Sequence, residues 1–333
     1  MRQVLVNPLS GYYMHGDVFG RQGDFITSPE ISQTFGELAG VWYLTEWMRL
    51  GKPAKTQFVE FGPGRGTLMS DILRALSRFP YFYETITDVH LIEASPGLRK
   101  MQRATLVEGS SDADVTRLAG DKDTFPVETI TRPDGVKVNW HDGIEVIPDQ
   151  WSFVMAHEFF DALPVHSFEK TEEGWREMLV DIDDTDESWS VMEKMAQLVQ
   201  RNGGAGLIID YGQDHIQGDT LRAIRKHRIV HPMSDPGSAD LSVDVDFDML
   251  KQVVAKTQGM AAFGPVTQSQ FLQSLGIQLR LEMLLKNAKT PESRKNMIQG
   301  VQRLLDPEQM GRIYKVLAFA HTTESAQSPP VGF

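Results

Sequence analysis

A short apolar run that ends in closely spaced glycines constrains this chain more than any other feature. Residues 58–66 read Phe-Val-Glu-Phe-Gly-Pro-Gly-Arg-Gly, and a helical pattern follows over 67–76. A strand, a glycine turn and a helix in this order begin a doubly wound α/β sheet, where ligands bind beyond the carboxyl ends of the strands. Glycines let the backbone approach a ligand that a Cβ atom would exclude. The run predicts a ligand at this turn; a tight turn without a ligand is the alternative.

The spacing of the glycines excludes two familiar phosphate-binding turns. A dinucleotide fingerprint requires Gly-x-Gly-x-x-Gly, and Thr67 stands where its third glycine would be. The Gly-x-x-x-x-Gly-Lys-Ser/Thr pattern is also absent. An acidic residue before a Gly-x-Gly-x-Gly turn resembles the first motif of S-adenosylmethionine-dependent methyltransferases. The residues expected to contact that cofactor here are Glu60, Gly62, Pro63, Gly64 and Gly66.

Two more predicted strands are followed by a carboxylate. Glu93 follows the apolar run 89–92, and it can accept hydrogen bonds from both hydroxyls of a ribose. Asp142, with Gly143, follows the run 136–140 and can accept from the amino group of an adenine. A solvated side chain at a strand end is the alternative for each. Three such carboxylates in order predict a nucleoside site.

Composition narrows the class of protein. The chain has 333 residues and a net charge of −12, which argues against a nucleic-acid partner, because phosphates require a basic face. It has no cysteine, so disulfides, thiol catalysis and thiolate metal sites are excluded. No apolar run approaches the roughly 20 residues of a membrane-spanning helix. The N-terminus has no signal-peptide pattern, and we expect a mature or trimmed form.

The periodicity predicts a parallel sheet with helices on both faces, completed by an antiparallel pair of strands. The expected strands are 58–61, 89–92, 136–140, 153–156 and 206–209, with 260–267 and 313–320 as the antiparallel pair. We divide the chain into an N-terminal segment (1–57) closing the site, a core (58–212), a helical accessory region (213–257 and 269–312) and the last strands (258–268 and 313–321).

Four local features refine this division. A helix is expected from Pro29 to about Leu50, capped by Ser28. Residues 103–135 read as an irregular insertion, and the acidic run 181–187 reads as a solvated loop. The tail 325–333 reads as disordered.

A pair of carboxylates follows the fourth predicted strand. Glu158 and Asp161 lie three residues apart in His-Glu-Phe-Phe-Asp-Ala-Leu-Pro, where both can face the crevice of the glycine turn. Two carboxylates can clamp the planar fork of an arginine guanidinium. The alternative is a helix cap at Asp161 and a surface Glu158. A zinc helix would need histidine where Asp161 stands, so we expect no metal.

The run 236–248 is a second acidic segment. A calcium loop would need glycine where Met249 follows its third acid, so we exclude calcium. Asp246 is expected to cap a helix. An acidic wall beside a cationic substrate is the alternative.

With these residues in hand, the chain resembles the MidA-type methyltransferases, mitochondrial protein arginine methyltransferases that act as complex I assembly factors. Residues 23–38 are similar to the N-terminal signature of the family, 60–69 to its cofactor loop, and 157–164 and 236–247 to its later motifs. The resemblance runs from about Asn7 to His321. It departs from the family before Met1, where the usual targeting sequence and first helix are missing.

The resemblance implies a Rossmann-like, seven-stranded class I methyltransferase fold that binds S-adenosylmethionine. It implies symmetric dimethylation of an arginine on a core subunit of respiratory complex I, in the mitochondrial matrix, or a cytoplasmic location in a bacterium. It also implies that the N-terminal segment closes over the cofactor through Phe25, Thr27, Ser28 and Gln33. Glu30 would join Glu158 and Asp161 in orienting the guanidinium.

Two other functions stay open at this stage. The chain could be a binding protein that uses the cofactor fold as an assembly chaperone with little turnover. It could also methylate a small molecule, which a closed, apolar acceptor pocket without paired carboxylates would favour. The sequence specifies no oligomeric state.

Overall fold

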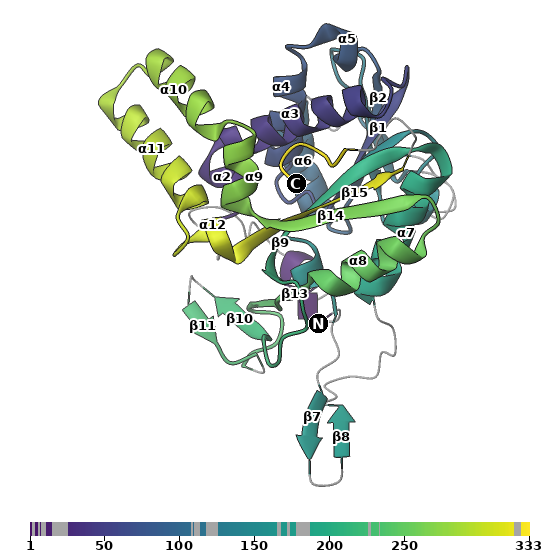
Figure 1. Cartoon of the computed structure of the whole chain (residues 1–333), viewed down its shortest axis with the longest axis vertical. Helices are drawn as coiled ribbons and strands as arrows, with labels where there is room; N and C mark the ends of the chain where they lie inside the picture. The colour runs from purple at the N-terminus through teal and green to yellow at the C-terminus, as the bar shows by residue number, and fades with distance from the viewer. Residues whose placement is uncertain are drawn as a thin grey trace.

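The computed structural model describes residues 1, 4–5, 7, 11–14, 26–107, 109, 114–117, 126–164, 168–171, 174–177, 187–225, 228–232, 234–322 and 328–333. A large, mostly parallel sheet forms its centre (Figure 1). Its seven main strands lie in the order β14 (Met260–Thr267), β15 (Tyr314–His321), β9 (Gly204–Gln213), β6 (Ser152–His157), β1 (Thr56–Phe61), β2 (Ile86–Ile92) and β5 (Lys137–His141). Strand β15 is antiparallel to both its neighbours, β14 and β9. The five strands from β9 to β5 in this order are parallel to one another. The predicted class I methyltransferase sheet is confirmed.

Alternating residues of the inner strands feed two separate cores, one on each face of the sheet. Phe58 and Phe153 point to one face, where they pack under the helices α3 (Gln33–Arg49) and α4 (Thr67–Leu76). Their neighbours Val59 and Val154 point to the other face, under α7 (Glu187–Asn202) and α8 (Phe247–Lys256). Strands covered on both faces read as continuous apolar runs, which explains why the sequence showed them clearly.

The expected N-terminal helix is broken in two. Thr27 precedes the short helix α2 (Ser28–Ile31), Ser32 is extended, and α3 then begins with its N-terminus capped by the Ser32 side chain. The predicted cap at Ser28 is therefore wrong. The Ser28 hydroxyl is buried and lies 3.3 Å from Oε1 of Gln268, so a contact distant in sequence replaces the local one.

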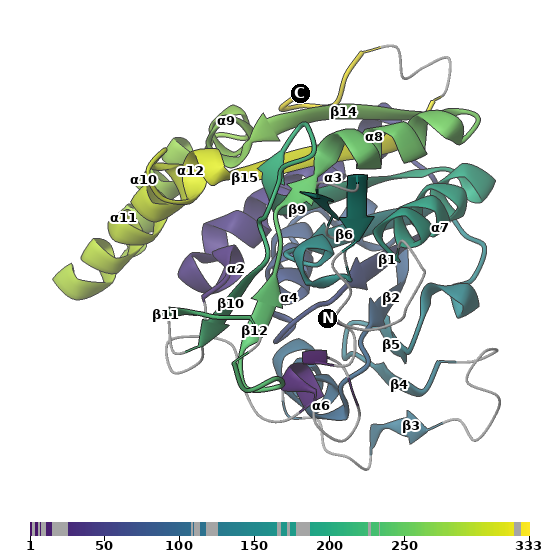
Figure 2. The same ribbon diagram turned by 90° about the horizontal axis from the view of Figure 1, so that it is seen from below.

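The insertion at 103–135 is more regular than expected. Residues 103–106 complete α6 (Pro96–Leu106), while β3 (Thr116–Arg117) and β4 (Glu128–Thr131) extend the sheet antiparallel beyond β5 (Figure 2). Arg103 of α6 forms an ion pair with Glu128 of β4, which fastens the extension to the core. The strands are too short for a periodic pattern to reveal them.

The region 213–257 is not mostly helical, because its described residues form short β-strands, loops and one helix. Strands β10 (Arg222–Arg225), β11 (Arg228–Val230) and β12 (Asp240–Ser242) form a small antiparallel sheet, and β13 (Val245–Asp246) pairs with β9. Ala223 and Leu241 of this sheet are buried against Leu5 and Tyr12 from the start of the chain. Among the described residues of this region, α8 is the only helix, and its N-terminus is capped by Asp246 as predicted.

The predicted helical region 269–312 is confirmed. It contains α9 (Gln268–Ser274), α10 (Ile277–Asn287), α11 (Pro291–Leu305) and α12 (Met310–Ile313). The remaining elements are η1 (Tyr12–Met14), α5 (Pro80–Tyr83), η3 (Ile144–Val146), η4 (Phe160–Ala162), β7 (Phe168–Thr171) and β8 (Gly174–Glu177). Among the described residues, no helix is long and apolar enough to cross a membrane.

The expected loop at 181–187 is described only at Glu187, the first residue of α7, because residues 181–186 lie outside the described part.

The end of the chain packs against the body, and residues 323–327 before it lie outside the described part. Pro330 is buried, and the Phe333 ring contacts Phe271 with ring centroids 5.7 Å apart. The expectation of disorder is therefore wrong for 328–333.

We predict that Phe333→Ala lowers the free energy of unfolding by about 1–2 kcal/mol, because it removes apolar contact with the core at Phe271. Val331→Ala is the matched control, since Val331 is exposed. Thermal unfolding measures both variants. Equal melting temperatures for Phe333→Ala and the parent chain would show that the terminal segment is not held.

Candidate active site

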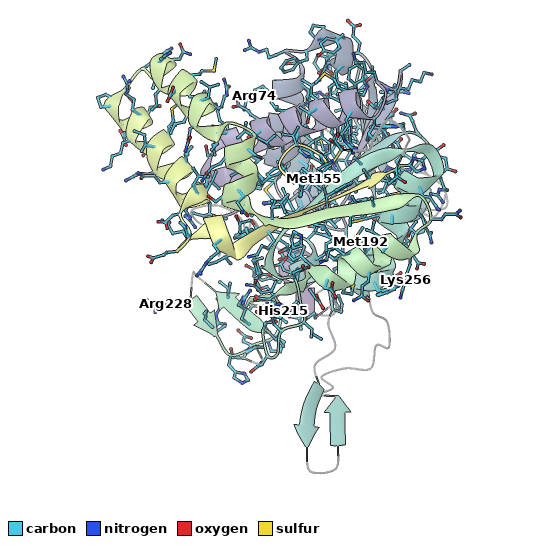
Figure 3. The ribbon with its side chains drawn as sticks, in the orientation of Figure 1. Arg74, Met155, Met192, His215, Arg228 and Lys256 are labelled. Carbon is cyan, nitrogen blue, oxygen red and sulfur yellow. The ribbon has the colours of Figure 1, made fainter. Side chains whose placement is uncertain are left out.

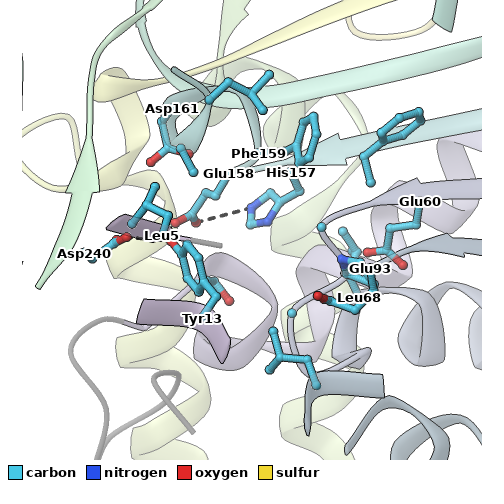
Figure 4. A pocket seen from close by; sticks show the side chains of 18 of the residues that line it. Leu5, Tyr13, Glu60, Leu68, Glu93, His157, Glu158, Phe159, Asp161 and Asp240 are labelled. Atoms are coloured by element: carbon cyan, nitrogen blue, oxygen red, sulfur yellow. Dashed lines mark hydrogen bonds and ion pairs between the residues drawn. The ribbon is translucent and has the colours of Figure 1, made fainter. Parts of the chain in front are cut away.

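A cavity of about 1090 Å³ lies over the carboxyl ends of the parallel strands. Carboxylates gather in it in two groups (Figure 4). The glycine half contains Glu60, the turn 62–66, Glu93 and Asp142; the acidic half contains Glu158, Asp161, Asp240 and Asp244. His157 lies between Glu158 and the glycine half.

The glycine turn connects β1 to α4 in a conformation that side chains disfavour. Gly62 and Gly64 have φ angles of 58° and 52°, in the left-handed region. A Cβ atom on Gly62 would come within 2.9 Å of the Phe159 ring. The N-terminus of α4 has no side-chain cap, so its first backbone N–H groups are available to a ligand.

Glu60 lies at the end of β1 with only 2% of its surface exposed. Burial raises the pKa of Glu60 to about 8. Its Oε2 atom has no hydrogen-bond partner among the described residues, although the side chain lines the cavity. A buried carboxyl oxygen of this kind is costly without a partner, so the site has a place for a donor or cation supplied by a ligand.

Glu93 is held in place from both sides. Its Oε1 accepts from the Ser95 N–H at 2.8 Å, and its Oε2 accepts from Nε2 of Gln102 at 3.0 Å. Burial is the largest cause of its shifted pKa, which is raised to about 7. The backbone N–H of Ala94 also donates to this carboxylate, which keeps acceptor capacity for a ligand hydroxyl.

Sequence reasoning missed Gln102 and Arg99 of α6. Nε2 of Gln102 also donates to the carbonyl of Gly64 at 2.7 Å, so one amide joins the glycine turn to Glu93. The Arg99 guanidinium donates to the carbonyl of Glu93 and pairs with Asp142, which is exposed at the cavity beside Gly143. No local motif marks either residue, because their partners come from separate strands.

In the acidic half, Glu158 has a backbone that non-glycine residues rarely adopt. Its φ angle is 49°, directly after β6. Its carboxylate accepts from the Ser28 N–H and from the Tyr314 hydroxyl. Burial is the main cause that raises its pKa to about 8, and the nearby Asp161 adds to it. Strain at such a position, kept by the surrounding structure, is typical of functional sites.

The histidine before Glu158 does not neutralise it. Nε2 of His157 lies 3.5 Å from Oε1 of Glu158, but burial lowers the pKa of His157 to about 3. His157 is therefore uncharged at neutral pH. A cation that favours the ionised form of Glu158 must come from elsewhere.

Asp161 is positioned by residues of β9. Oδ2 of Asp210 accepts from the backbone N–H groups of residues 159, 160 and 161 at 3.2, 3.1 and 3.3 Å, and it thereby fixes the turn between Glu158 and Asp161. The Tyr211 hydroxyl donates to Oδ2 of Asp161. Burial is the largest influence on the pKa of Asp161, which is raised to about 6, while Tyr211 and Arg222 oppose the rise.

Arg222 brings a guanidinium into the acidic half. It lies over the Tyr211 ring, 4.7 Å from the centroid, and its Nη2 is 2.5 Å from Oδ1 of Asp244. Tyr13 donates its hydroxyl to Oδ1 of Asp240 at 2.6 Å, so the start of the chain also borders this half. One carboxylate and a tyrosine ring thus already hold an arginine head group here.

Only some of the N-terminal residues predicted to line the site do so in the structure. Thr27 and Glu30 line the cavity, and Oε1 of Glu30 lies 3.6 Å from Nη1 of Arg65 in the glycine turn. Ser28 lies behind the lining and reaches Glu158 through its backbone. Phe25 lies outside the described residues.

Gln33 does not line the main cavity. The extended Ser32 ends α2, and Gln33 is exposed at the start of α3, beside a separate groove against α10 and α11. The structure therefore does not bring Gln33 to the cavity where the other predicted cofactor residues lie, and the break between α2 and α3 explains its position. Among the described residues, no group of three or more histidines and carboxylates could hold a metal ion.

The sheet order, the left-handed glycine turn and the carboxylates at successive strand ends define a class I, nucleoside-binding methyltransferase. Residues 38–191 and 185–266 match the family described as S-adenosyl-L-methionine-dependent methyltransferase. The chain belongs to this family, and its cofactor is S-adenosylmethionine.

Named relatives narrow the family further. The mitochondrial protein arginine methyltransferase NDUFAF7 of Xenopus laevis is 38% identical over 373 residues, covering 100% of this chain and 84% of the relative. The human protein of that name is 38% identical over 352 residues, covering 96% of this chain and 78% of the relative. Both are named as mitochondrial, which supports a mitochondrial location here.

A solved structure agrees in fold. A protein from Burkholderia thailandensis, bound to S-adenosyl-homocysteine, superposes with a TM-score of 0.77 at 23% identity, covering 100% of this chain and 88% of that one. The residues of the glycine half fit the cofactor of the family. The turn has left-handed φ angles at Gly62 and Gly64, and Oε2 of Glu60 lacks a partner in the described part of the chain.

We predict that Glu93→Ala weakens S-adenosylmethionine binding by tenfold to a hundredfold, since a lost charge-assisted pair of hydrogen bonds costs about 1.5–3 kcal/mol. Titration calorimetry measures the affinity. Glu84→Ala, at an exposed position after α5, is the control. Unchanged affinity of Glu93→Ala would remove Glu93 from the cofactor site.

Proposed function

We propose that this chain transfers methyl groups from S-adenosylmethionine to the guanidinium of an arginine in a protein. The names of the curated relatives support this reaction.

The finer assignment rests on family resemblance. We propose symmetric dimethylation of an arginine on a core subunit of respiratory complex I, in the mitochondrial matrix, during assembly of the complex. The division of labour that we propose along the chain follows the two halves of the cavity. Glu60, Gly62, Pro63, Gly64, Gly66, Glu93, Asp142, Gly143 and Thr27 serve the cofactor, and Glu158, Asp161 and Glu30 serve the acceptor.

In this reaction the protein chiefly has to orient the acceptor guanidinium and to stabilise its positive charge. Bound S-adenosylmethionine supplies a methyl group already activated on a sulfonium. A free guanidinium stays protonated and is a poor nucleophile at neutral pH. Glu158 and Asp161 orient it and draw its positive charge away from the attacking nitrogen. Because the pKa of Glu158 is about 8, its carboxylate can also accept the proton that the product loses.

Isotope transfer tests the proposed function directly. Incubation of candidate protein acceptors with isotope-labelled S-adenosylmethionine, followed by mass spectrometry, should find label on an arginine side chain. Bound cofactor without transfer to any protein would contradict the proposal and favour a non-catalytic assembly protein. Label only on small molecules would favour a different substrate class.

We predict that Glu158→Gln reduces single-turnover methyl transfer by at least about a hundredfold at saturating cofactor, because removing one partner of a buried charge pair costs about 3 kcal/mol or more. Cofactor affinity should change little, since the amide keeps the shape. The exposed Glu282→Gln on α10 is the control. A parental rate for Glu158→Gln would place the acceptor elsewhere.

We also predict that acceptor binding strengthens as the pH rises from about 6 to about 8, the pKa values of Asp161 and Glu158. Both values are raised, so the carboxylates are protonated at low pH and gain charge across this window. The KM for the acceptor should fall by up to about tenfold per pH unit. A pH series at saturating cofactor measures it, and Glu158→Gln should lose the upper part of the dependence.

A further inference from the structure

The acidic half opens toward solvent between the small sheet and the α11–α12 region. Four residues both line the cavity and are exposed there, so they form its rim: Arg228 and Ile229 of β11, Arg303 of α11 and Ile313 of α12. Ile229 is 78% exposed and Ile313 is 48% exposed. Large apolar side chains at the opening of a polar cavity favour contact with a partner.

Strand β11 has one open edge in the described part of the chain. The small sheet has the order β11-β10-β12, so β11 pairs with β10 alone, in the register Ile224 with Ile229. Figure 1 shows β11 at the border of this sheet, below α12. Figure 3 shows Arg228 at the same outer position. An open strand edge can pair with an extended peptide through its backbone groups.

The charges of the opening are opposite to those of the carboxylates inside, where Arg222 is already paired with Asp244. Glu158, Asp161 and Asp240 line the inside, whereas Arg228 and Arg303 stand on the rim of a chain with a net charge of −12. When a substrate arginine enters the acidic half, the residues on either side of it in the substrate lie against this rim. Acidic neighbours are attracted there and basic neighbours are repelled.

We propose that the rim binds an extended segment of the protein substrate in which a single arginine is flanked by apolar and acidic residues. The segment lies along β11, its apolar residue contacts Ile229 and Ile313, and its acidic residue faces Arg228 and Arg303. Arginine-rich segments are excluded by the same two cations. This inference rests on the proposed function, because it assigns the sequence around the acceptor arginine.

Peptide binding tests the rim separately from catalysis. A short fluorescent peptide with one arginine between leucine and aspartate is titrated into the full chain loaded with S-adenosyl-homocysteine. Ile229→Asp should weaken its binding at least about tenfold, because the new carboxylate repels the aspartate of the peptide and the apolar contact with its leucine is lost. Ile216→Asp is the matched control, since Ile216 is 81% exposed and does not line the cavity.

Charge reversal tests specificity. The double variant Arg228→Glu and Arg303→Glu should lose preference for the acidic peptide and gain preference for one with lysine in place of aspartate. A peptide with methylated backbone nitrogens beside the arginine should bind weakly to the parent chain, because it cannot pair with β11. Equal binding by Ile229→Asp and Ile216→Asp, or parental preference for an arginine-rich peptide, overturns the inference.

The same peptides separate this inference from the proposed function. Methyl transfer by the parent chain to an arginine, with no effect of the rim variants on KM, would contradict the rim alone. Peptide binding that depends on the rim, without transfer to any arginine, would contradict the proposed function.

Discussion

The acidic half depends on one buried carboxylate that never needs to touch a substrate. Asp210 is fully buried at the end of β9, and its Oδ2 atom accepts from three successive backbone N–H groups. Those N–H groups belong to the turn that follows Glu158, a residue in the left-handed conformation. Without the anchor, the turn could relax and Glu158 would lose its orientation. Its strain is thus offset by a local array of hydrogen bonds.

Burial raises the pKa of Asp210 well above its usual range, and it has the same effect on the carboxylates that line the cavity. Glu60, Glu93, Glu158 and Asp161 all show raised pKa values, and burial is the first cause for each. A cavity of acids poised near neutral pH differs from an ordinary surface cluster, because each group can stay neutral until a cation arrives. Both halves of the cavity therefore favour positively charged ligands, because a cation stabilises the ionised form of their buried carboxylates.

The strand ends could be read from the sequence, since the information is local. Each buried strand is a continuous apolar run, and parallel strands present their carboxyl ends at one edge, so Glu60, Glu93, Asp142 and Glu158 were found together. The small sheet could not be read in this way. Strand β10 is held by Leu5 and Tyr12, more than two hundred positions away along the chain, and its own residues have no periodic pattern. Arg222 and its aromatic support were missed for that reason.

The break between α2 and α3 could not be predicted from local sequence either. It depends on packing between the two ends of the chain, and that packing also shapes the site. Helix propensity does not distinguish one helix over 29–50 from two, but α11 packs closely against α2. A Cβ atom on Gly300 would come within 2.9 Å of the Ile31 carbonyl. This packing places α2 so that the Ser28 N–H donates to Glu158 while Glu30 faces Arg65 of the glycine turn. The first and last thirds of the chain therefore fix the charge and position of Glu158 in the middle third, and the acceptor site that we propose is complete only when all three are folded together.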